Sequence, residues 1–209
     1  MHSPLISSFV TLFVVVDPVG VAVAAGGLTH GLSREARRSI ATRGTLIAGL
    51  ILILFAVGGE ALLRALGITL PALRVAGGLL LFLLSIDMVF ARPSGIRSPT
   101  APEQAEANQR NDIAVFPLAF PLLAGPGAMT SVVLLMARAE GPTGIAEVVG
   151  ALVAVLALAF LGLRFVERVT NLLGLTGANV VGRVSGVILA ALAAQFVLDG
   201  LAQALPRLP

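Results

Sequence analysis

The segment LFVVVDPVG (residues 12–20) places an aspartate, a proline and a glycine inside an apolar run that extends over residues 5–26. About 20 apolar residues are enough for a helix to cross a membrane. Proline removes a backbone donor and clashes with the preceding helical turn, and glycine tolerates the unwound backbone. We therefore expect residues 5–26 to form a first transmembrane helix, retained in the mature protein and broken near its middle at Asp17.

The composition agrees with a membrane protein over the whole chain. Hydrophobic residues make up 57% of the 209 residues and charged residues only 12%, whereas soluble domains carry about 25% charged residues. This little charge cannot cover a water-facing surface, and the hydrophobicity is too high for disorder. The net charge of +3 comes from fourteen scattered arginines with few aromatic residues, so we expect no nucleic-acid partner.

Five further apolar runs are also long enough to cross a membrane. With the first, they lie at about residues 5–26, 41–59, 71–91, 113–137, 145–166 and 181–202. The sequence therefore predicts an all-α, six-span membrane protein forming a single integral membrane domain over residues 1–209. Within it we expect two three-helix repeats, residues 1–91 and 113–209, joined by a polar, proline-rich linker loop at 92–112.

The two halves resemble each other at an almost constant offset. Three matches occur in the same order, at offsets of 107, 108 and 109: Glu60–Thr69 with Glu167–Thr176, Pro18 with Pro126, and the Arg-Val-Ala-Gly run from Arg74 with the Arg-Val-Ser-Gly run from Arg183. Three spans is an odd number, so duplicated halves would run in opposite directions. Inverted three-helix repeats are typical of secondary transporters. The alternative is chance similarity between apolar stretches.

The segment FPLAFPLLAGPGA (residues 116–128) predicts a second break, near the middle of the fourth span. Proline suits the first position of a helix, so Pro18 and Pro126 would each start a half-helix whose free N–H groups and positive end lie at the membrane midplane. Asp17 then occupies an N-cap position. Gly125 occupies the equivalent position in the second half and offers no side-chain cap.

This asymmetry suggests a site for a small zwitterion. The amides of Gly127 and Ala128 would receive a substrate carboxylate, and Asp17 would face an ammonium group or carry a coupling proton. Each feature has a structural alternative: Asp17 as a cap alone, and the Gly125–Gly127 segment as a kink that permits close packing. A charged residue at the membrane centre costs roughly 2.5–3.5 kcal/mol on insertion scales, which favours a role for Asp17.

The predicted substrate-binding residues are Asp17, Pro18, Gly20, Gly125, Pro126, Gly127, Ala128, Thr130 and Gln195. Thr130 has a backbone-bonded alternative, and Gln195, inside the sixth span, has an interhelical hydrogen bond as its alternative. Arg74 and Arg183 begin equivalent spans, where we expect them to anchor the helices or to snorkel. The only histidines, His2 and His30, lie near the membrane borders and no catalytic or metal motif is present, so we expect no enzyme, catalytic residue, metal or cofactor.

The arginines predict the orientation. Six spans place ten arginines in or beside the loops between spans 1–2, 3–4 and 5–6, and four on the other side. The positive-inside rule then puts these three loops in the cytoplasm and both termini outside.

Several motifs together resemble the MarC family of bacterial multi-pass inner-membrane proteins. They are LFVVVDPVG (12–20) with the arginine-rich loop after it, LRVAGGLLLFLLSIDM (73–88), FPLAFPLLAGPGAMTS (116–131) and VILAALAAQFVLDGL (187–201). The resemblance implies six spans and a location in the bacterial plasma (inner) membrane. The family is named after a multiple-antibiotic-resistance locus, which does not establish drug export. An archaeal branch is associated with proton-coupled uptake of glycine and alanine.

The leading functional prediction is a secondary transporter of a small neutral solute in the lipid bilayer, with an amino acid as candidate solute and protons as candidate coupling ions. The alternatives are an exporter of another small solute and a non-transporting structural or regulatory membrane protein. A channel would need rings of residues from an oligomer. Substrate, direction and oligomeric state, including a homo-oligomer, are left open by the sequence.

Overall fold

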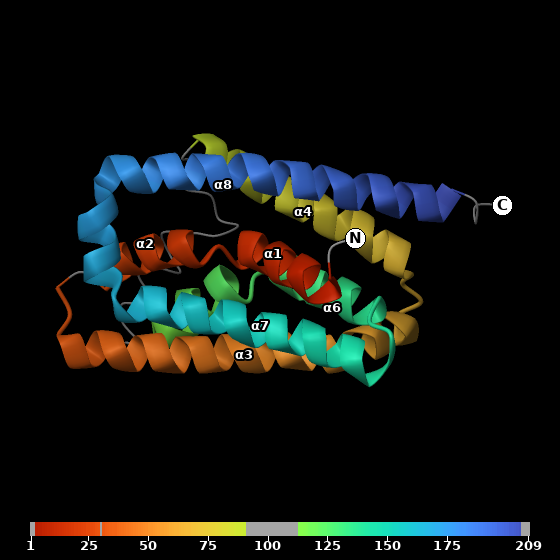
Figure 1. Cartoon of the computed structure of the whole chain (residues 1–209), viewed down its shortest axis with the longest axis horizontal. Helices are drawn as coiled ribbons and strands as arrows, with labels where there is room; N and C mark the ends of the chain where they lie inside the picture. Colours follow the sequence, from red (N-terminus) through yellow and green to blue (C-terminus); the bar gives the residue numbers. More distant parts are fainter. Residues whose placement is uncertain (1–2, 30, 91–112, 206–209) are drawn as a thin grey trace.

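The computed structural model describes residues 3–29, 31–90 and 113–205, which form helices and short turns without a strand (Figure 1). The predicted linker loop, 92–112, lies outside these ranges. In chain order the elements are α1 (Pro4–Val16), α2 (Pro18–Leu28), α3 (Arg34–Ala65), α4 (Leu70–Phe90), η1 (Ala114–Leu123), α6 (Pro126–Ala137), α7 (Gly141–Arg164) and α8 (Val166–Ala204). The prediction of an all-α protein is confirmed.

Five segments are long and apolar enough to cross a membrane: Pro4–Leu28 taken through its break, α3, α4, α7 and Asn179–Ala204 of α8. η1 and α6, bent by 54° at their junction, pass the same test together. α3 has 32 residues, and at 1.5 Å per residue it is longer than the hydrocarbon core of about 30 Å. Its arginine-rich first turns can therefore extend beyond the apolar layer.

α3 turns small residues toward the protein and large apolar residues outward. Its buried residues are Ala41, Gly44, Ala48, Leu52, Ala56 and Gly59, spaced three or four apart along one face. On the outer face Leu46 is 68% exposed and Val57 is 77% exposed. In water these outer side chains would be unfavourable, whereas lipid tails solvate them. The helix surface therefore matches a bilayer environment.

Each long helix packs against the broken segment of the other half of the chain. α3, which follows the first break, lies against η1 and α6, and α7, which follows the second break, lies against α1 and α2. Glycines make these approaches close: a Cβ at Gly44 would lie 2.6 Å from Cδ2 of Leu118, and one at Gly162 would lie 3.2 Å from Cβ of Ala22. The two halves are therefore interlaced, not stacked side by side.

α4 and α8 pack along their lengths in opposite directions. A Cβ at Gly200, near the end of α8, would lie 2.7 Å from Cγ2 of Val75 near the start of α4. At the other end of the pair, a Cβ at Gly186 would lie 2.9 Å from Cβ of Met88. The third helix of one half thus runs antiparallel to the third helix of the other.

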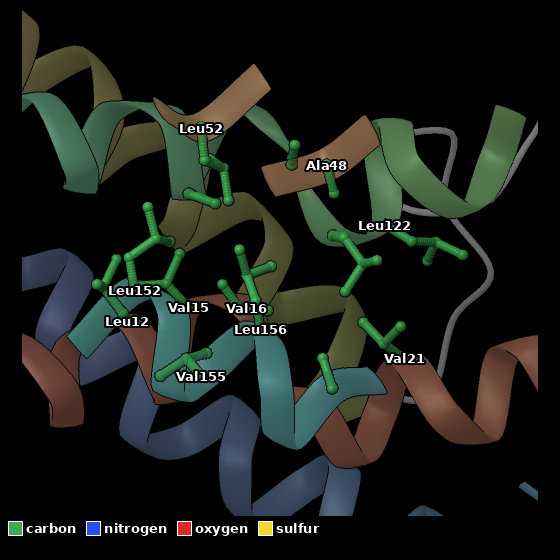
Figure 2. Close-up of a cluster of buried hydrophobic side chains, with 14 of the residues drawn as sticks. Leu12, Val15, Val16, Val21, Ala48, Leu52, Leu122, Leu152, Val155 and Leu156 are labelled. Atoms are coloured by element: carbon green, nitrogen blue, oxygen red, sulfur yellow. The ribbon is translucent and has the colours of Figure 1, made fainter. Parts of the chain in front are cut away.

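The hydrophobic core surrounds the first helix break (Figure 2). Side chains of α1, α3 and α7 pack around Val16, which is fully buried, as are Leu12, Leu52, Leu152 and Val155. Leu122 of η1 and Val21 of α2 continue the cluster past the break. The unwound backbone is therefore enclosed by protein.

α8 changes direction at Gly174, whose φ of 61° and ψ of 179° interrupt the helix. This positive φ is readily adopted by glycine alone. Figure 1 shows the first turns of α8 crossing the end of the bundle and the remainder running along it. We refer to Phe165–Gly174, the chain between α7 and the long part of α8, as the α7–α8 elbow.

The α4–α8 contact leaves no room for a methyl group at Gly78. A Cβ there would lie 2.9 Å from the carbonyl oxygen of Ala193 and 3.0 Å from the amide nitrogen of Val197, both backbone atoms. We expect Gly78→Ala to destabilise the protein by about 1–3 kcal/mol because the helices must separate. Thermal unfolding followed by circular dichroism in detergent measures this. In the matched control Gly58→Ala the added Cβ meets nothing within 4 Å, and equal destabilisation by both variants would contradict the packing argument.

Candidate functional site

The first helix break is organised by Asp17. Its backbone is left-handed (φ 52°, ψ 69°), a conformation that aspartate tolerates better than most residues. Its N–H donates to the carbonyl oxygen of Phe13 (2.9 Å) at the end of α1. Its Oδ1 accepts from the N–H of Gly20 (3.1 Å) at the start of α2. The predicted N-cap is therefore present, and one residue ends α1 and begins α2.

Gly20 leaves room for this cap. A Cβ built at Gly20 would overlap Oδ2 of Asp17 and would lie 2.8 Å from its Cγ. Asp17 itself is only 6% exposed, so its carboxylate has little space to move elsewhere. The Asp-Pro-Val-Gly motif thus has a local reason: aspartate caps, proline occupies the first helical position, and glycine accommodates the carboxylate.

The second break, between η1 and α6, is built differently. Phe116 and Phe120 have extended backbones (φ −131° and −130°), as expected for residues before proline, and the bonds to Pro117 and Pro121 are cis. The extended backbones of Phe116 and Phe120 make η1 an irregular segment, in keeping with the predicted break of the fourth span. α6 then begins at Pro126, and within the described residues no side chain caps it at Gly125.

The uncapped start of α6 is covered by apolar side chains. A Cβ at Gly127 would overlap Cδ2 of Leu81 in α4 and would lie 3.5 Å from Cγ1 of Val15 in α1. Leu81 is fully buried. Because Val15 lies two residues before Asp17, this contact brings the first break beside the second.

A cavity of about 20 Å³ lies at this contact. It is lined by Val15, Leu80, Leu81, Leu84, Pro121, Leu122, Leu123, Gly125, Pro126, Gly127 and Ala128. A volume of this size holds about one water molecule. The conformation is therefore closed to an amino acid at the breaks, and Asp17 and Gly20 do not line the cavity.

The remaining predicted site residues lie apart from this cavity. Thr130 is buried one turn into α6 and packs its methyl group against Gly77 of α4. It also borders an apolar cavity of about 180 Å³ between α3, α4 and α6. Gln195 is exposed on α8, where its Nε2 donates to Oδ1 of Asp199 (2.6 Å). Asp199 in turn forms an ion pair with Arg138 at 3.4 Å.

Arg74 departs from the expectation that it snorkels. The side chain is only 4% exposed, and its Nε and Nη1 make no hydrogen bond within the described residues. Arg138 and Asp199 lie within electrostatic range. Arg183, its counterpart in the sequence match, is exposed. The pattern of equivalent arginines could not reveal this difference, because burial here depends on how α4 packs against α6 and α8.

Acidic and histidine side chains are dispersed. Within the described part of the chain, no three of them come together in a group that could hold a metal ion.

The cap geometry makes a prediction for Gly20. Gly20→Ala should lose the Asp17 cap and destabilise the protein by about 0.5–2 kcal/mol. Combined with Asp17→Ala, the two losses should not add, because both variants remove the same hydrogen bond. A double-mutant cycle of thermal unfolding tests this, with Gly27→Ala in the same helix as the control because its Cβ meets nothing within 4 Å. Full additivity would contradict the shared bond.

Comparison with known proteins places this arrangement in a family. The family model described as MarC family integral membrane protein matches residues 2–205. A membrane protein of Archaeoglobus fulgidus is 38% identical over 200 residues, covering 95% of this chain and 92% of that protein. Membrane protein YvbG of Bacillus subtilis is 34% identical over 208 residues, covering 100% and 99%.

Membrane protein YhcE of Escherichia coli is 32% identical over 203 residues, covering 96% of this chain and 93% of that protein. No solved structure matches the chain. The family match covers both helix breaks and all of the described helices. The chain therefore belongs to the MarC family and is an integral, multi-pass membrane protein.

Proposed function

We propose that this protein is a secondary transporter of a small neutral solute, with glycine and alanine as the first candidates and protons as the coupling ion. The proposal places the solute where the two helix breaks meet, and it assigns no enzymatic step to the chain. It also places the protein in the plasma membrane, with the arginine-rich loops in the cytoplasm and the termini outside, following the arginine distribution.

The observation that carries the proposal is the pair of interrupted segments in contact with each other. Two broken helices that meet inside a membrane protein are the best structural pointer to a transporter site. One half-helix start, at Pro18, is capped by Asp17. The other, at Pro126, has no side-chain cap among the described residues. An uncapped helix start attracts an anionic group, which supports binding of a substrate carboxylate at Gly127 and Ala128.

An inverted repeat is supported by the way the halves interlace. If α4 and α8 are equivalent helices, their antiparallel packing means that the two halves have opposite orientations. α3 of the first half packs against the second broken segment, and α7 of the second half packs against the first broken segment. Each half therefore makes the same kind of contact with the other. Inverted repeats allow alternating access by rocking one half against the other around a fixed site.

In this proposal the described conformation is the closed one. Leu81 and Val15 cover Gly127, and the adjoining cavity has room for about one water molecule. Movement of α4 away from α6 would expose the amides at the start of α6. The larger apolar cavity beside Thr130 lies between the same two helices and α3, so space is already present along this path.

The same small cavity favours the second candidate, a non-transporting structural or regulatory protein. In that case the breaks serve only close packing, and Asp17 serves only as a cap. An exporter of another small solute would use the same site with the opposite direction of net flux.

The first experiment is uptake of labelled alanine and glycine into proteoliposomes, with and without an inward proton gradient. We expect gradient-driven accumulation by the wild type. Asp17→Asn should abolish the proton dependence yet leave the unfolding temperature nearly unchanged, since asparagine caps a helix as well as aspartate but carries no proton. Asp17→Ala should abolish the proton dependence and should also lower the unfolding temperature, because alanine removes the cap.

The matched control is Asp87→Asn, the same chemical change in α4 at a residue outside the lining of the cavity at the breaks. It should retain gradient-driven uptake. Proton-driven uptake that persists in Asp17→Asn would reduce Asp17 to a cap. Absence of uptake and of efflux for both solutes in correctly inserted wild type would favour the second candidate, in which the breaks serve only close packing.

A further inference from the structure

A third cavity, of about 180 Å³, lies at the end of the bundle where α3 begins and α7 ends. Its charged lining consists of Arg34, Arg37, Arg38, Arg164, Arg168 and Glu167. Five arginines and one glutamate leave a strong excess of positive charge around the space. The cavity is smaller than the roughly 300–1,000 Å³ clefts that take drug-sized ligands, so it suits a small anionic group.

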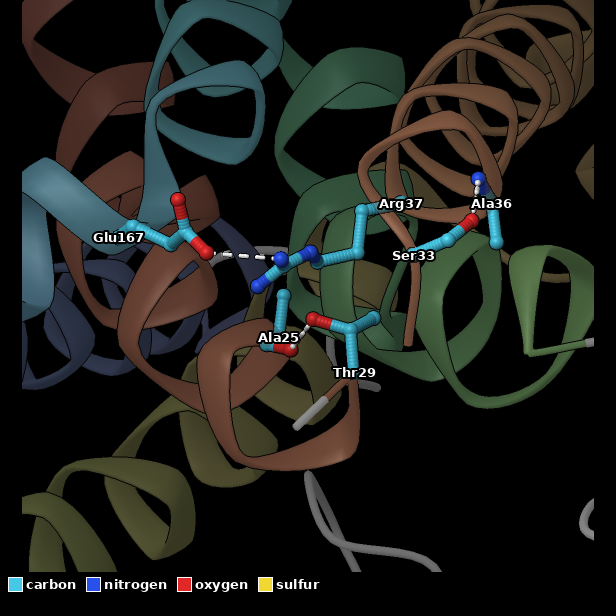
Figure 3. A network of polar contacts seen from close by, with 6 residues as sticks. All are labelled: Ala25, Thr29, Ser33, Ala36, Arg37 and Glu167. Carbon is cyan, nitrogen blue, oxygen red and sulfur yellow. Dashed lines mark hydrogen bonds and ion pairs between the residues drawn. The ribbon is translucent and has the colours of Figure 1, made fainter. Parts of the chain in front are cut away.

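An ion pair connects two of the chain segments that line this cavity. Nη2 of Arg37 lies 2.7 Å from Oε1 of Glu167, joining α3 to the α7–α8 elbow (Figure 3). The side chains of Ser33 and Thr29 brace the turn before α3: Oγ of Ser33 accepts from the N–H of Ala36, and the hydroxyl of Thr29 donates to the carbonyl oxygen of Ala25. The single glutamate of the lining is therefore paired with Arg37, and arginines outnumber it in the lining.

The other four arginines of the lining belong to three different segments of the chain. Arg34 and Arg38 lie on the first turns of α3, Arg164 on the last turn of α7, and Arg168 on the elbow. The guanidinium of Arg168 lies 5.2 Å from the ring centroid of Phe165, a cation–π contact between two residues of the lining. Guanidinium groups bind phosphate oxygens through paired hydrogen bonds, and the positive end of α3 adds to the same field.

The surroundings of the cavity match the border of a membrane. Phe165 is 45% exposed and Leu172 is 86% exposed on the elbow, while the membrane-spanning part of α8 begins only at Asn179. Phe165, which lines the cavity, thus places an exposed apolar ring beside the arginines, at the end of α7. A phosphate group with an attached acyl chain would satisfy both features.

We propose that this cavity is a binding site for a phosphate group, carried by an anionic phospholipid or by a soluble phosphate. A bound phosphate contacts arginines of α3, α7 and the elbow, and so ties together elements from both halves of the chain. The site is separate from the helix breaks and does not depend on the proposed transport activity.

The test uses the purified full chain in detergent and native mass spectrometry. Phosphatidylglycerol should bind about tenfold more tightly than zwitterionic phosphatidylcholine, because both lipids carry the phosphate but the choline cation is repelled by the arginines of the lining. Arg38→Gln with Arg164→Gln should weaken phosphatidylglycerol binding about tenfold or more. The matched control is Arg64→Gln, at the far end of α3 and exposed, which should bind like the wild type.

A lysine pair separates binding from membrane orientation. Arg38→Lys with Arg164→Lys keeps the charge that orients the protein but loses the paired guanidinium hydrogen bonds, so it should still insert and bind phosphatidylglycerol more weakly than the wild type. If the glutamine double variant does not fold, the lysine double variant still tests whether these two arginines bind the lipid. Inorganic phosphate distinguishes the two sources: competition at millimolar concentration assigns the site to soluble phosphates, and binding of phosphatidylglycerol without such competition assigns it to the lipid.

Equal binding of the two lipids without any effect of inorganic phosphate would overturn the proposal. So would wild-type affinity in both arginine pairs, or an equal loss in Arg64→Gln, since binding would then follow overall charge instead of this cavity.

Discussion

Backbone amide and carbonyl groups inside an apolar layer must find partners within the protein, and this constraint is most severe where α1 ends and α2 begins. The carboxylate and left-handed backbone of Asp17 meet it, because one residue supplies an acceptor to α2 and a donor to α1. The surrounding core closes over the break, with Val16 fully buried beside it. The long helices α3 and α7 are placed so that each encloses the broken segment of the other half.

Small residues make that enclosure feasible. Apolar surface gains little by leaving lipid for another apolar surface, so helix association in membranes depends on close van der Waals approach. Gly44 and Gly59 of α3 and Gly186 and Gly200 of α8 lie so close to neighbouring helices that even a methyl group would collide. The bundle is consequently tight at the breaks, where a cavity of about 20 Å³ remains. A solute can enter only if the helices separate, which links the packing directly to the proposed alternation between conformations.

The two breaks differ in chemistry although they occupy matching positions. The first carries its own carboxylate, which is bonded to its own helix, and the second presents backbone amides beneath Leu81 and Val15. The proposed function therefore assigns the substrate carboxylate to the second break. At the end of the bundle the electrostatics are again positive, from arginines that belong to both halves. The two proposals thus place anion binding at two separate positions, one enclosed between helices and one at the end of the bundle.

Local chemistry determined much of this structure from the sequence alone. Apolar run length set the spans, and Pro18, Pro126 and the neighbouring glycines set the helix starts, because these effects act within one or two turns. Asp17 was identifiable as a cap for the same reason. The tertiary structure alone decided that the halves exchange partners, that Leu81 covers Gly127, and that Arg74 is buried while Gln195 is exposed. Those outcomes depend on contacts between residues far apart in the chain, and the spacing of residues within one helix carries no information about which neighbour its face will meet.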